Sequence, residues 1–244
     1  MSAIYEDPKV LSEYLLFHYG NSDEILPSEI SWPVGMREAL DFAVRTPSHF
    51  GDSVVDRGLD LGCAVGRSTF EMSRSCRQVT GIDFSYAFIG AARELCSGKR
   101  VAYDRLDEAH CRVALEASVE PGLDTSGVNF MQGDAMDLPN DLGSFERVHA
   151  ANLLCRLSDP ERLLERLPEL VKTGGELVLA TPCTWLAEFT PPAKWPQSDT
   201  LAWLKSHLGE AFELIEETDE PFLIRETARK FQWTRSLVTV WSRR

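Results

Sequence analysis

A run of small residues after an apolar stretch is the part of this sequence best suited to chemistry. The run lies within residues 56–69, and its acidic or small members stand at every second position: Asp60, Gly62, Ala64 and Gly66. Small side chains leave backbone N–H groups uncovered, so a nucleotide-like ligand can approach them closely. We therefore expect a buried strand that ends at Leu61, a tight ligand-binding turn, and a helix that opens near Gly66.

The spacing of these residues separates two classes of ligand. A loop that binds a dinucleotide pyrophosphate reads Gly-x-Gly-x-x-Gly, and counted from Gly62 its third small residue would fall at Arg67. The pattern Asp60-x-Gly62-x-Ala64-x-Gly66 instead resembles the first motif of the class I S-adenosylmethionine (SAM) methyltransferases. In that superfamily the loop passes under the methionine moiety of SAM. Ala64 departs from the commonest glycine, which is a mild change because a methyl group is small.

Three later positions follow strand-like runs and extend the resemblance. Asp83 stands 21 residues after Gly62, and Asp134 and Asn152 each follow a further apolar run. A carboxylate at Asp83 can accept both ribose hydroxyl hydrogens, and the resemblance implies that Asp134 takes the adenine amino group. Open α/β sheets bind ligands at the carboxyl ends of their strands, so these positions point to one cleft. The resemblance implies SAM as the cofactor, S-adenosylhomocysteine as its product, and the following binding residues: Asp60, Gly62, Cys63, Ala64, Gly66, Asp83, Phe84, Ser85, Asp134, Ala135 and Asn152.

Alternating strand and helix patterns position these residues. The sequence predicts strands over 55–61, 78–83, 128–132, 145–150 and 175–181, and helices over 66–75, 86–97 and 159–171. This alternation is typical of a mostly parallel sheet with helices on both faces. The class I methyltransferase resemblance implies a Rossmann-like α/β fold with seven strands, of which the last is antiparallel.

The remaining segments flank that core. We expect a single domain over 1–244, with an N-terminal helical cap (1–53), a SAM-binding core (54–181) and a C-terminal substrate-side segment ending in a β-hairpin (182–244). Apolar spacing and chain breakers predict helices over 8–19, 33–44 and 198–208, and β-like runs over 212–217 and 237–241. Residues 99–127 are polar and charged, and we interpret them as a surface insertion with a helix over 108–118.

Composition limits the class of partner. The chain has 25 basic and 38 acidic residues, a formal net charge of −13, which disfavours nucleic acid as a substrate and favours a small molecule. Its six cysteines never form a Cys-x-x-Cys pair, so we expect neither a metal site nor a disulfide framework. The sequence shows no export signal and no apolar run long enough for a membrane helix, so we expect a cytoplasmic protein without a membrane partner.

Two segments outside the core bear on what receives the methyl group. The site after the fourth core strand reads Asn152-Leu153-Leu154-Cys155, and it lacks the Asn/Asp-Pro-Pro-aromatic run usual in enzymes that methylate nucleic-acid bases. Residues 11–20 place two tyrosines and a histidine on a predicted helix, and residues 225–233 form a locally basic, aromatic run. Basic side chains of this kind can clamp a carboxylate.

These two segments carry a narrower resemblance. Together, Tyr5-Glu6, the run Tyr-Leu-Leu-Phe-His-Tyr-Gly (14–20), the loop 60–67 and the run Arg-Glu-Thr-Ala-Arg-Lys (225–230) before Trp241 resemble the mercaptohistidine N-methyltransferases of the ovothiol pathway. In that family the domain is often fused behind a sulfoxide synthase, so this chain resembles the stand-alone form. The resemblance implies a functional link to such a synthase and to a lyase, and a substrate pocket lined by Tyr14, His18, Tyr19, Arg225, Lys230 and Trp233.

The resemblance implies transfer of a methyl group from SAM to a ring nitrogen of 5-mercaptohistidine. No residue is assigned as a certain catalytic group, and Tyr14, His18 and Asn152 are candidates for positioning the acceptor. The tyrosines fit a packing role equally well, and His18 also fits a hydrogen-bonded core residue. Two alternatives stay open: a methyltransferase of another small amino-acid or carboxylate metabolite, and a non-catalytic SAM-binding regulator.

Overall fold

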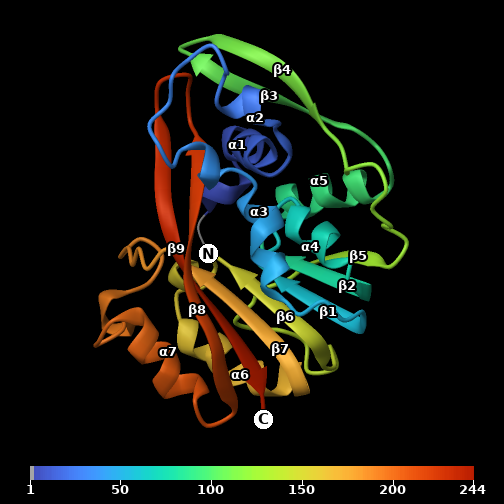
Figure 1. The fold of residues 1–244 in the computed structure, drawn as a ribbon, viewed down its shortest axis with the longest axis vertical. Coiled ribbons are helices and arrows are strands. Elements are labelled where there is room, and N and C mark those ends of the chain that lie inside the picture. Colours follow the sequence, from blue (N-terminus) through green and yellow to red (C-terminus); the bar gives the residue numbers. More distant parts are fainter. Residues whose placement is uncertain (1–2) are drawn as a thin grey trace.

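Seven strands form one sheet, in the order β5-β2-β1-β6-β7-β9-β8, in the computed structural model, which describes residues 3–244 (Figure 1). The strands span Val55–Leu61 (β1), Cys76–Asp83 (β2), Val128–Gln132 (β5), Phe145–Ala151 (β6), Val171–Thr181 (β7), Phe212–Arg225 (β8) and Phe231–Arg243 (β9). Neighbouring strands are parallel from β5 to β7, and β9 runs antiparallel to both β7 and β8. This arrangement confirms the predicted Rossmann-like α/β sheet with an antiparallel last strand.

Helices cover both faces of this sheet, as predicted (Figure 1). Alternate residues of β7 face opposite sides. Leu177 packs in the apolar cluster that contains α6 (Pro160–Leu170) and α7 (Thr200–Leu208), whereas Val178 packs in the cluster that contains α3 (Phe42–Arg45). On the face opposite α6 and α7, Phe70 of α4 lies against Phe130 of β5, with ring centroids 5.3 Å apart. The helices span Arg67–Met72 (α4), Tyr86–Cys96 (α5), Pro160–Leu170 (α6) and Thr200–Leu208 (α7), with 3-10 turns at Leu154–Arg156 (η4) and Pro192–Lys194 (η5). None of the helices described over residues 3–244 combines the length and apolar character needed to cross a membrane.

The N-terminal segment forms a cap of short helical pieces. They span Ala3–Glu6 (η1), Pro8–Tyr19 (α1), Ser22–Ile25 (α2), Arg37–Ala39 (η2), Phe42–Arg45 (α3) and Thr46–His49 (η3). The helix predicted over 8–19 is therefore confirmed. The helix predicted over 33–44 is wrong: the backbone takes φ +88° at Gly35, an extended conformation at Leu40 and φ +58° at Asp41, which breaks the segment into a 3-10 turn and one helical turn.

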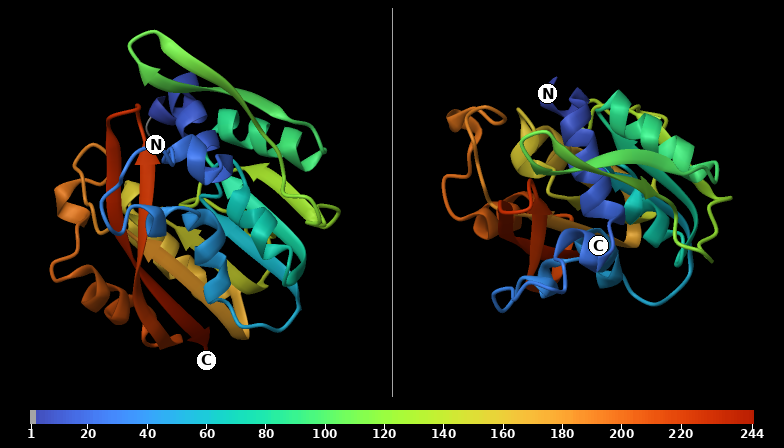
Figure 2. Two further views of the ribbon diagram at one scale, coloured as in Figure 1. Left: turned by 45° about the horizontal axis from the view of Figure 1, so that its top comes forward. Right: turned by 90° about the horizontal axis from the view of Figure 1, so that it is seen from above.

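The charged insertion is a hairpin and not a helix. Val101–Glu108 (β3) pairs antiparallel with Cys111–Ala117 (β4) in a separate two-stranded sheet, so the helix predicted over 108–118 is wrong. Tyr103 and Ala117 are buried against the cap, because alternate residues of each strand share one face. Figure 2 shows the green hairpin lying over the blue helix α1.

The C-terminal hairpin is longer than predicted, and this changes the position of the basic run. Strands β8 and β9 pair from Phe212↔Arg243 to Arg225↔Phe231, so residues 226–230 form the turn at the far end of the hairpin. Arg225, at the end of β8, is buried beside this turn. Because the pairing extends this far, Arg225 and Lys230, which were predicted to bind the substrate, lie away from the carboxyl edge of the sheet.

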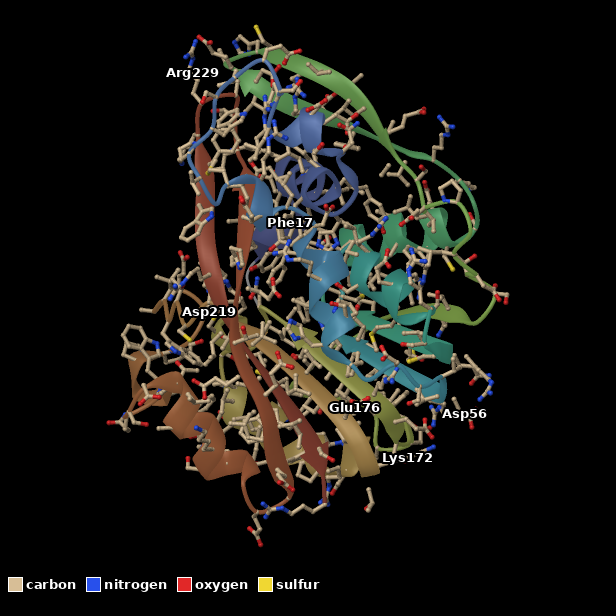
Figure 3. The ribbon with its side chains drawn as sticks, viewed as in Figure 1. Phe17, Asp56, Lys172, Glu176, Asp219 and Arg229 are labelled. Carbon is tan, nitrogen blue, oxygen red and sulfur yellow. The ribbon has the colours of Figure 1, made fainter. Side chains whose placement is uncertain are left out.

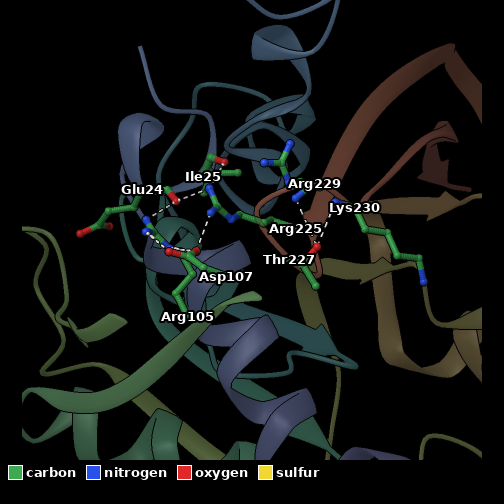
Figure 4. A network of polar contacts seen from close by, with 8 residues as sticks. All are labelled: Glu24, Ile25, Arg105, Asp107, Arg225, Thr227, Arg229 and Lys230. Carbon is green, nitrogen blue, oxygen red and sulfur yellow. Dashed lines mark hydrogen bonds and ion pairs between the residues drawn. The ribbon is translucent and has the colours of Figure 1, made fainter. Parts of the chain in front are cut away.

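Arg225 is the centre of a polar network that ties three distant segments together (Figure 4). Its guanidinium donates to Asp107 Oδ1 of β3 at 2.7 Å and to the carbonyl oxygens of Glu24 and Ile25 at 3.2 and 2.8 Å. Arg105 donates to both oxygens of the same Asp107, at 2.9 and 3.0 Å. We call Arg225, Asp107, Arg105 and the two carbonyls the latch, since they hold α2, the β3–β4 hairpin and β8 against one another.

The carboxyl ends of four parallel strands meet at one edge of the sheet. The register pairs Asp60 of β1 with Gly81 of β2 and with His149 of β6, and it pairs Asp83 of β2 with Gln132 of β5. The loops that follow these strands are therefore neighbours in space, as expected for a ligand-binding edge.

Removal of the Arg225 guanidinium is expected to destabilise the protein. In Arg225→Met, two backbone carbonyls lose a donor and Asp107 loses one of its two arginines, so the free energy of unfolding in urea should fall by about 3 kcal/mol. Arg229→Met removes an exposed charge from the same turn and should change it by less than about 0.5 kcal/mol. Equal stability of the two variants would contradict the role given to the latch.

Candidate active site

The loop after β1 follows a left-handed path. Gly62, Ala64 and Gly66 have φ values of +71°, +47° and +90°. A Cβ atom at position 66 would lie 2.6 Å from the Phe130 ring, so glycine is required there for both backbone conformation and packing. The left-handed conformation of Ala64 is unfavourable for an L-residue. The hydrogen bond that its N–H donates to Asp83 Oδ2, at 2.9 Å, helps to offset this cost.

Asp83 joins this loop to the one after β2. Its Oδ1 accepts the N–H of Ser85 at 2.9 Å, while its Oδ2 accepts the N–H of Ala64. Burial raises the pKa of the Asp83 carboxyl to about 6, although the two backbone hydrogen bonds act to lower it. Each oxygen keeps a second lone pair, so an ionised Asp83 can accept the hydrogens of two neighbouring hydroxyl groups.

A buried polar chain lies behind the loop. Asp60 Oδ2 accepts from the Thr69 hydroxyl at 2.7 Å, and Asp60 Oδ1 lies 2.8 Å from His149 Nδ1. His149 Nε2 lies 3.1 Å from the Thr46 hydroxyl of the cap. Both carboxylate oxygens of Asp60 therefore already have protein hydrogen-bond partners. His149 was missed by the sequence reasoning, since a single histidine in a strand gives no signal until β6 is aligned beside β1.

A cavity of about 470 Å³ opens above the carboxyl edge of the sheet. Among the predicted cofactor residues, its lining includes Asp60, Gly62, Cys63, Ala64, Asp83, Phe84, Ala135 and Asn152. Gly66 opens α4 behind the loop, Ser85 accepts the Phe88 N–H as the cap of α5, and Asp134 accepts the Met136 N–H in the turn after β5. The loops that follow the four strands β1, β2, β5 and β6 therefore meet at the carboxyl edge of the sheet, as predicted.

The cap helix α1 forms one wall of the cavity. It contributes Val10, Glu13, Tyr14, Phe17 and His18 to the lining. Figure 3 places Phe17 near the middle of the molecule, between the cap and the sheet, where its ring lies 6.3 Å from that of Phe42 and 6.2 Å from that of Phe222. The Tyr14 ring packs 4.7 Å from Phe88 of α5.

His18 is a neutral, unpaired group in this wall. Burial lowers the pKa of its imidazole to about 3, and the nearby Arg67 acts in the same direction. Its Nδ1 is buried without a hydrogen-bond partner among residues 3–244. A buried polar atom without a partner is uncommon in proteins, and beside a cavity it can be satisfied by a ligand.

The structure does not bring four of the predicted substrate residues to the cavity. Tyr19 donates its hydroxyl hydrogen to the Val65 carbonyl at 2.8 Å, which attaches α1 to the cofactor loop. Arg225 belongs to the latch, and Lys230 pairs with Glu226 at the hairpin turn. Trp233 is half-exposed, and its Nε1 donates to the Gly35 carbonyl. The hairpin lines the cavity instead through Phe222, Ile224, Gln232 and Thr234.

Other residues that line the cavity were not among the predicted site residues. Tyr5 of η1 stacks with Phe189, with ring centroids 6.4 Å apart, and Arg156 of η4 lies over the same Phe189 ring at 4.8 Å. Glu188 also lines the cavity. These residues lie in three different parts of the chain, and no spacing within any one of them signals the contact.

Comparison with known proteins agrees with this geometry. A family model described as a methyltransferase domain matches residues 59–179, which run from the cofactor loop to β7. The chain is a SAM-dependent methyltransferase with a Rossmann-like fold. An O-methyltransferase of Penicillium expansum is 26% identical over 88% of this chain and 71% of its own length. A demethylmenaquinone methyltransferase of Lactococcus lactis is 26% identical over 78% of this chain and 61% of its own length.

Solved structures show the same fold. The N-methyltransferase NodS of Bradyrhizobium japonicum, solved with S-adenosylhomocysteine, superposes over 97% of this chain and 99% of its own, with a TM-score of 0.56 and 18% identity. The YcgJ protein of Bacillus subtilis covers 79% of this chain and 93% of its own, with a TM-score of 0.52 and 14% identity. The methyltransferase-domain match, together with this fold, indicates SAM as the methyl donor.

Affinity for S-adenosylhomocysteine is expected to depend on the ionisation of Asp83. Because the ionised carboxylate accepts hydroxyl hydrogens and the free group has a pKa of about 6, the dissociation constant should be about tenfold higher at pH 5 than at pH 8. Asp83→Asn should bind more weakly and without this pH dependence, as measured by calorimetry. A constant affinity of the wild type over this range would contradict the expectation.

Proposed function

We propose that SAM lies across the carboxyl edge of the sheet. In this placement the turn from Gly62 to Gly66 passes under the methionine moiety, Asp83 accepts the two ribose hydroxyls, and the turn at Asp134 meets the adenine. The left-handed loop, the free lone pairs of Asp83 and the cavity lining of Gly133 and Ala135 support this placement. SAM then supplies an electrophilic methyl group, and the protein residues bind and orient it.

We further propose that the acceptor is 5-mercaptohistidine, methylated at a ring nitrogen. One observation carries this proposal: α1, which holds part of the narrower family resemblance, forms a wall of the cavity beside the cofactor loop. A pocket with aromatic side chains, a neutral histidine and several carboxylates suits a small, polar, ring-containing amino acid. A sulfoxide synthase and a lyase of the same pathway would supply this acceptor.

The main task of such an enzyme is alignment. The methyl group of a sulfonium is already reactive, so the pocket needs to hold a ring nitrogen in line with the methyl–sulfur bond and exclude water. The acceptor thiolate is the better nucleophile, so the pocket must also hold sulfur away from the methyl group. His18 offers an unpaired ring nitrogen for this purpose. Asn152 has its side-chain oxygen bonded to the Ser236 hydroxyl at 2.6 Å, which leaves its amide hydrogens as donors.

One alternative acceptor is kept beside the leading one. Another small amino-acid or carboxylate metabolite could occupy the same cavity, since its volume and polar lining are not specific to an imidazole. The methyltransferase-domain match and the methyltransferase relatives argue against the remaining alternative, a SAM-binding regulator without catalysis.

Incubation with SAM and 5-mercaptohistidine is expected to give a product heavier by one CH2 unit. Two-dimensional NMR that correlates the new methyl protons with ring carbons should place the methyl group on nitrogen. Asp83→Ala, which lacks the proposed ribose acceptor, serves as the control and should give little product. Turnover of plain histidine or of another carboxylate acceptor, with none of 5-mercaptohistidine, would refute the leading proposal.

Replacement of His18 is expected to change where the methyl group goes. His18→Phe keeps an aromatic ring in the wall but removes the polar contact proposed to hold the acceptor, so the ratio of S-methylated to N-methylated product should rise. Affinity for S-adenosylhomocysteine should stay within about twofold of the wild type, which is a change of less than about 0.5 kcal/mol in binding free energy. An unchanged product ratio would show that His18 only packs.

A further inference from the structure

Arg156 has an unusual electrostatic position. Among the described residues that line the cavity it is the single arginine or lysine, whereas Glu13, Asp60, Asp83 and Glu188 contribute carboxyl groups. None of the ion pairs found within residues 3–244 involves Arg156. A cation without a counter-ion in the cavity of a protein with a net charge of −13 is suited to an anionic ligand.

The guanidinium of Arg156 is held in place without its charge being neutralised. Its Nη1 donates to the carbonyl oxygens of Cys155 and Thr184 at 3.2 and 3.1 Å, and its plane lies over the Phe189 ring. The same nitrogen also donates to Cys155 Sγ at 3.4 Å, and the side chain of Arg156 interacts with the Tyr5 phenol beside it. Nη2 and Nε, which these Nη1 bonds do not use, form a pair of donors that matches the two oxygens of a carboxylate.

Tyr5 adds a second donor at the same place. Burial raises the pKa of the Tyr5 phenol, while the charge of Arg156 beside it acts to lower that pKa. The phenol is therefore protonated at neutral pH and can donate a hydrogen bond. Tyr5 comes from η1 of the cap, Arg156 from η4 after β6 and Phe189 from the segment after β7, so the group is assembled from three parts of the chain.

Two carboxylates could meet this arginine, because SAM and an amino-acid acceptor each carry one. In the placement proposed above, SAM is held mainly by the loops after β1, β2 and β5, with Asn152 of the loop after β6 at its margin, whereas Arg156 lies further along that last loop and packs on Phe189 from the segment after β7. The acceptor is the better match for that side of the cavity. We propose that Arg156 binds the α-carboxylate of the amino-acid acceptor, an inference that rests on the function proposed above.

The test compares 5-mercaptohistidine with its decarboxylated analogue, 5-mercaptohistamine. Both are titrated by calorimetry into the protein loaded with S-adenosylhomocysteine, so that the readout does not require turnover. The wild type should bind the acid at least about tenfold more tightly than the amine, a factor that corresponds to one charge-assisted contact. In Arg156→Gln this preference should fall to about twofold or less, and Arg156→Lys should restore part of it.

Arg162→Gln is the matched control, because it removes the same charge from an exposed position on α6. It should keep the wild-type preference for the acid. Equal binding of acid and amine by the wild type would overturn the proposal. A loss of affinity for S-adenosylhomocysteine in Arg156→Gln, with the acceptor preference intact, would assign the arginine to the cofactor and also overturn it.

The outcome for Arg156 can be separated from the outcome for the proposed function. If the wild type binds and methylates 5-mercaptohistidine but Arg156→Gln keeps the preference for the acid, the function stands and the assignment of Arg156 fails. If the wild type binds neither compound, the proposed acceptor fails and the assignment fails with it.

Discussion

The site depends on one carboxylate that holds two loops together. Asp83 accepts one backbone N–H from the loop after β1 and one from the loop after β2. The first of these loops runs through left-handed residues that have few other ways to satisfy their backbone. Because both bonds are made by buried backbone groups, the carboxylate is fixed before any ligand arrives, and its remaining lone pairs have a defined direction.

The cap is attached to the same two loops. The Tyr19 hydroxyl bonds the Val65 carbonyl, and the Ser85 hydroxyl donates to the Tyr5 carbonyl at 3.0 Å. Glu6 accepts the N–H groups of Tyr86 and Ala87, at the positive end of the α5 dipole. The cap, which forms one wall of the cavity, is thus positioned by the loops after β1 and β2 that form another part of its lining.

More distant contacts keep the cap closed over the sheet. The latch draws α2, the β3–β4 hairpin and β8 together around Asp107. Within the basic run at 225–230, Arg225 therefore stabilises the cap, whereas Lys230 pairs with Glu226 at the turn. Neither residue lines the cavity.

The sequence by itself determined most of the sheet and the loops at its carboxyl edge. Small residues at alternate positions, and acidic residues after apolar runs, are local patterns, and local backbone geometry follows from them; the loop at Gly62, Asp83 and most of the sheet were predicted for that reason. On the other side of the cavity the sequence pointed to Tyr14, His18 and Asn152, which line it, and the tertiary structure decided the rest. The β8–β9 register moved Arg225 and Lys230 away from the site, and long-range packing brought Arg156, Phe189 and Tyr5 together from segments that share no pattern in the sequence. Such contacts depend on how distant elements pack, and residue spacing within one segment carries no information about that.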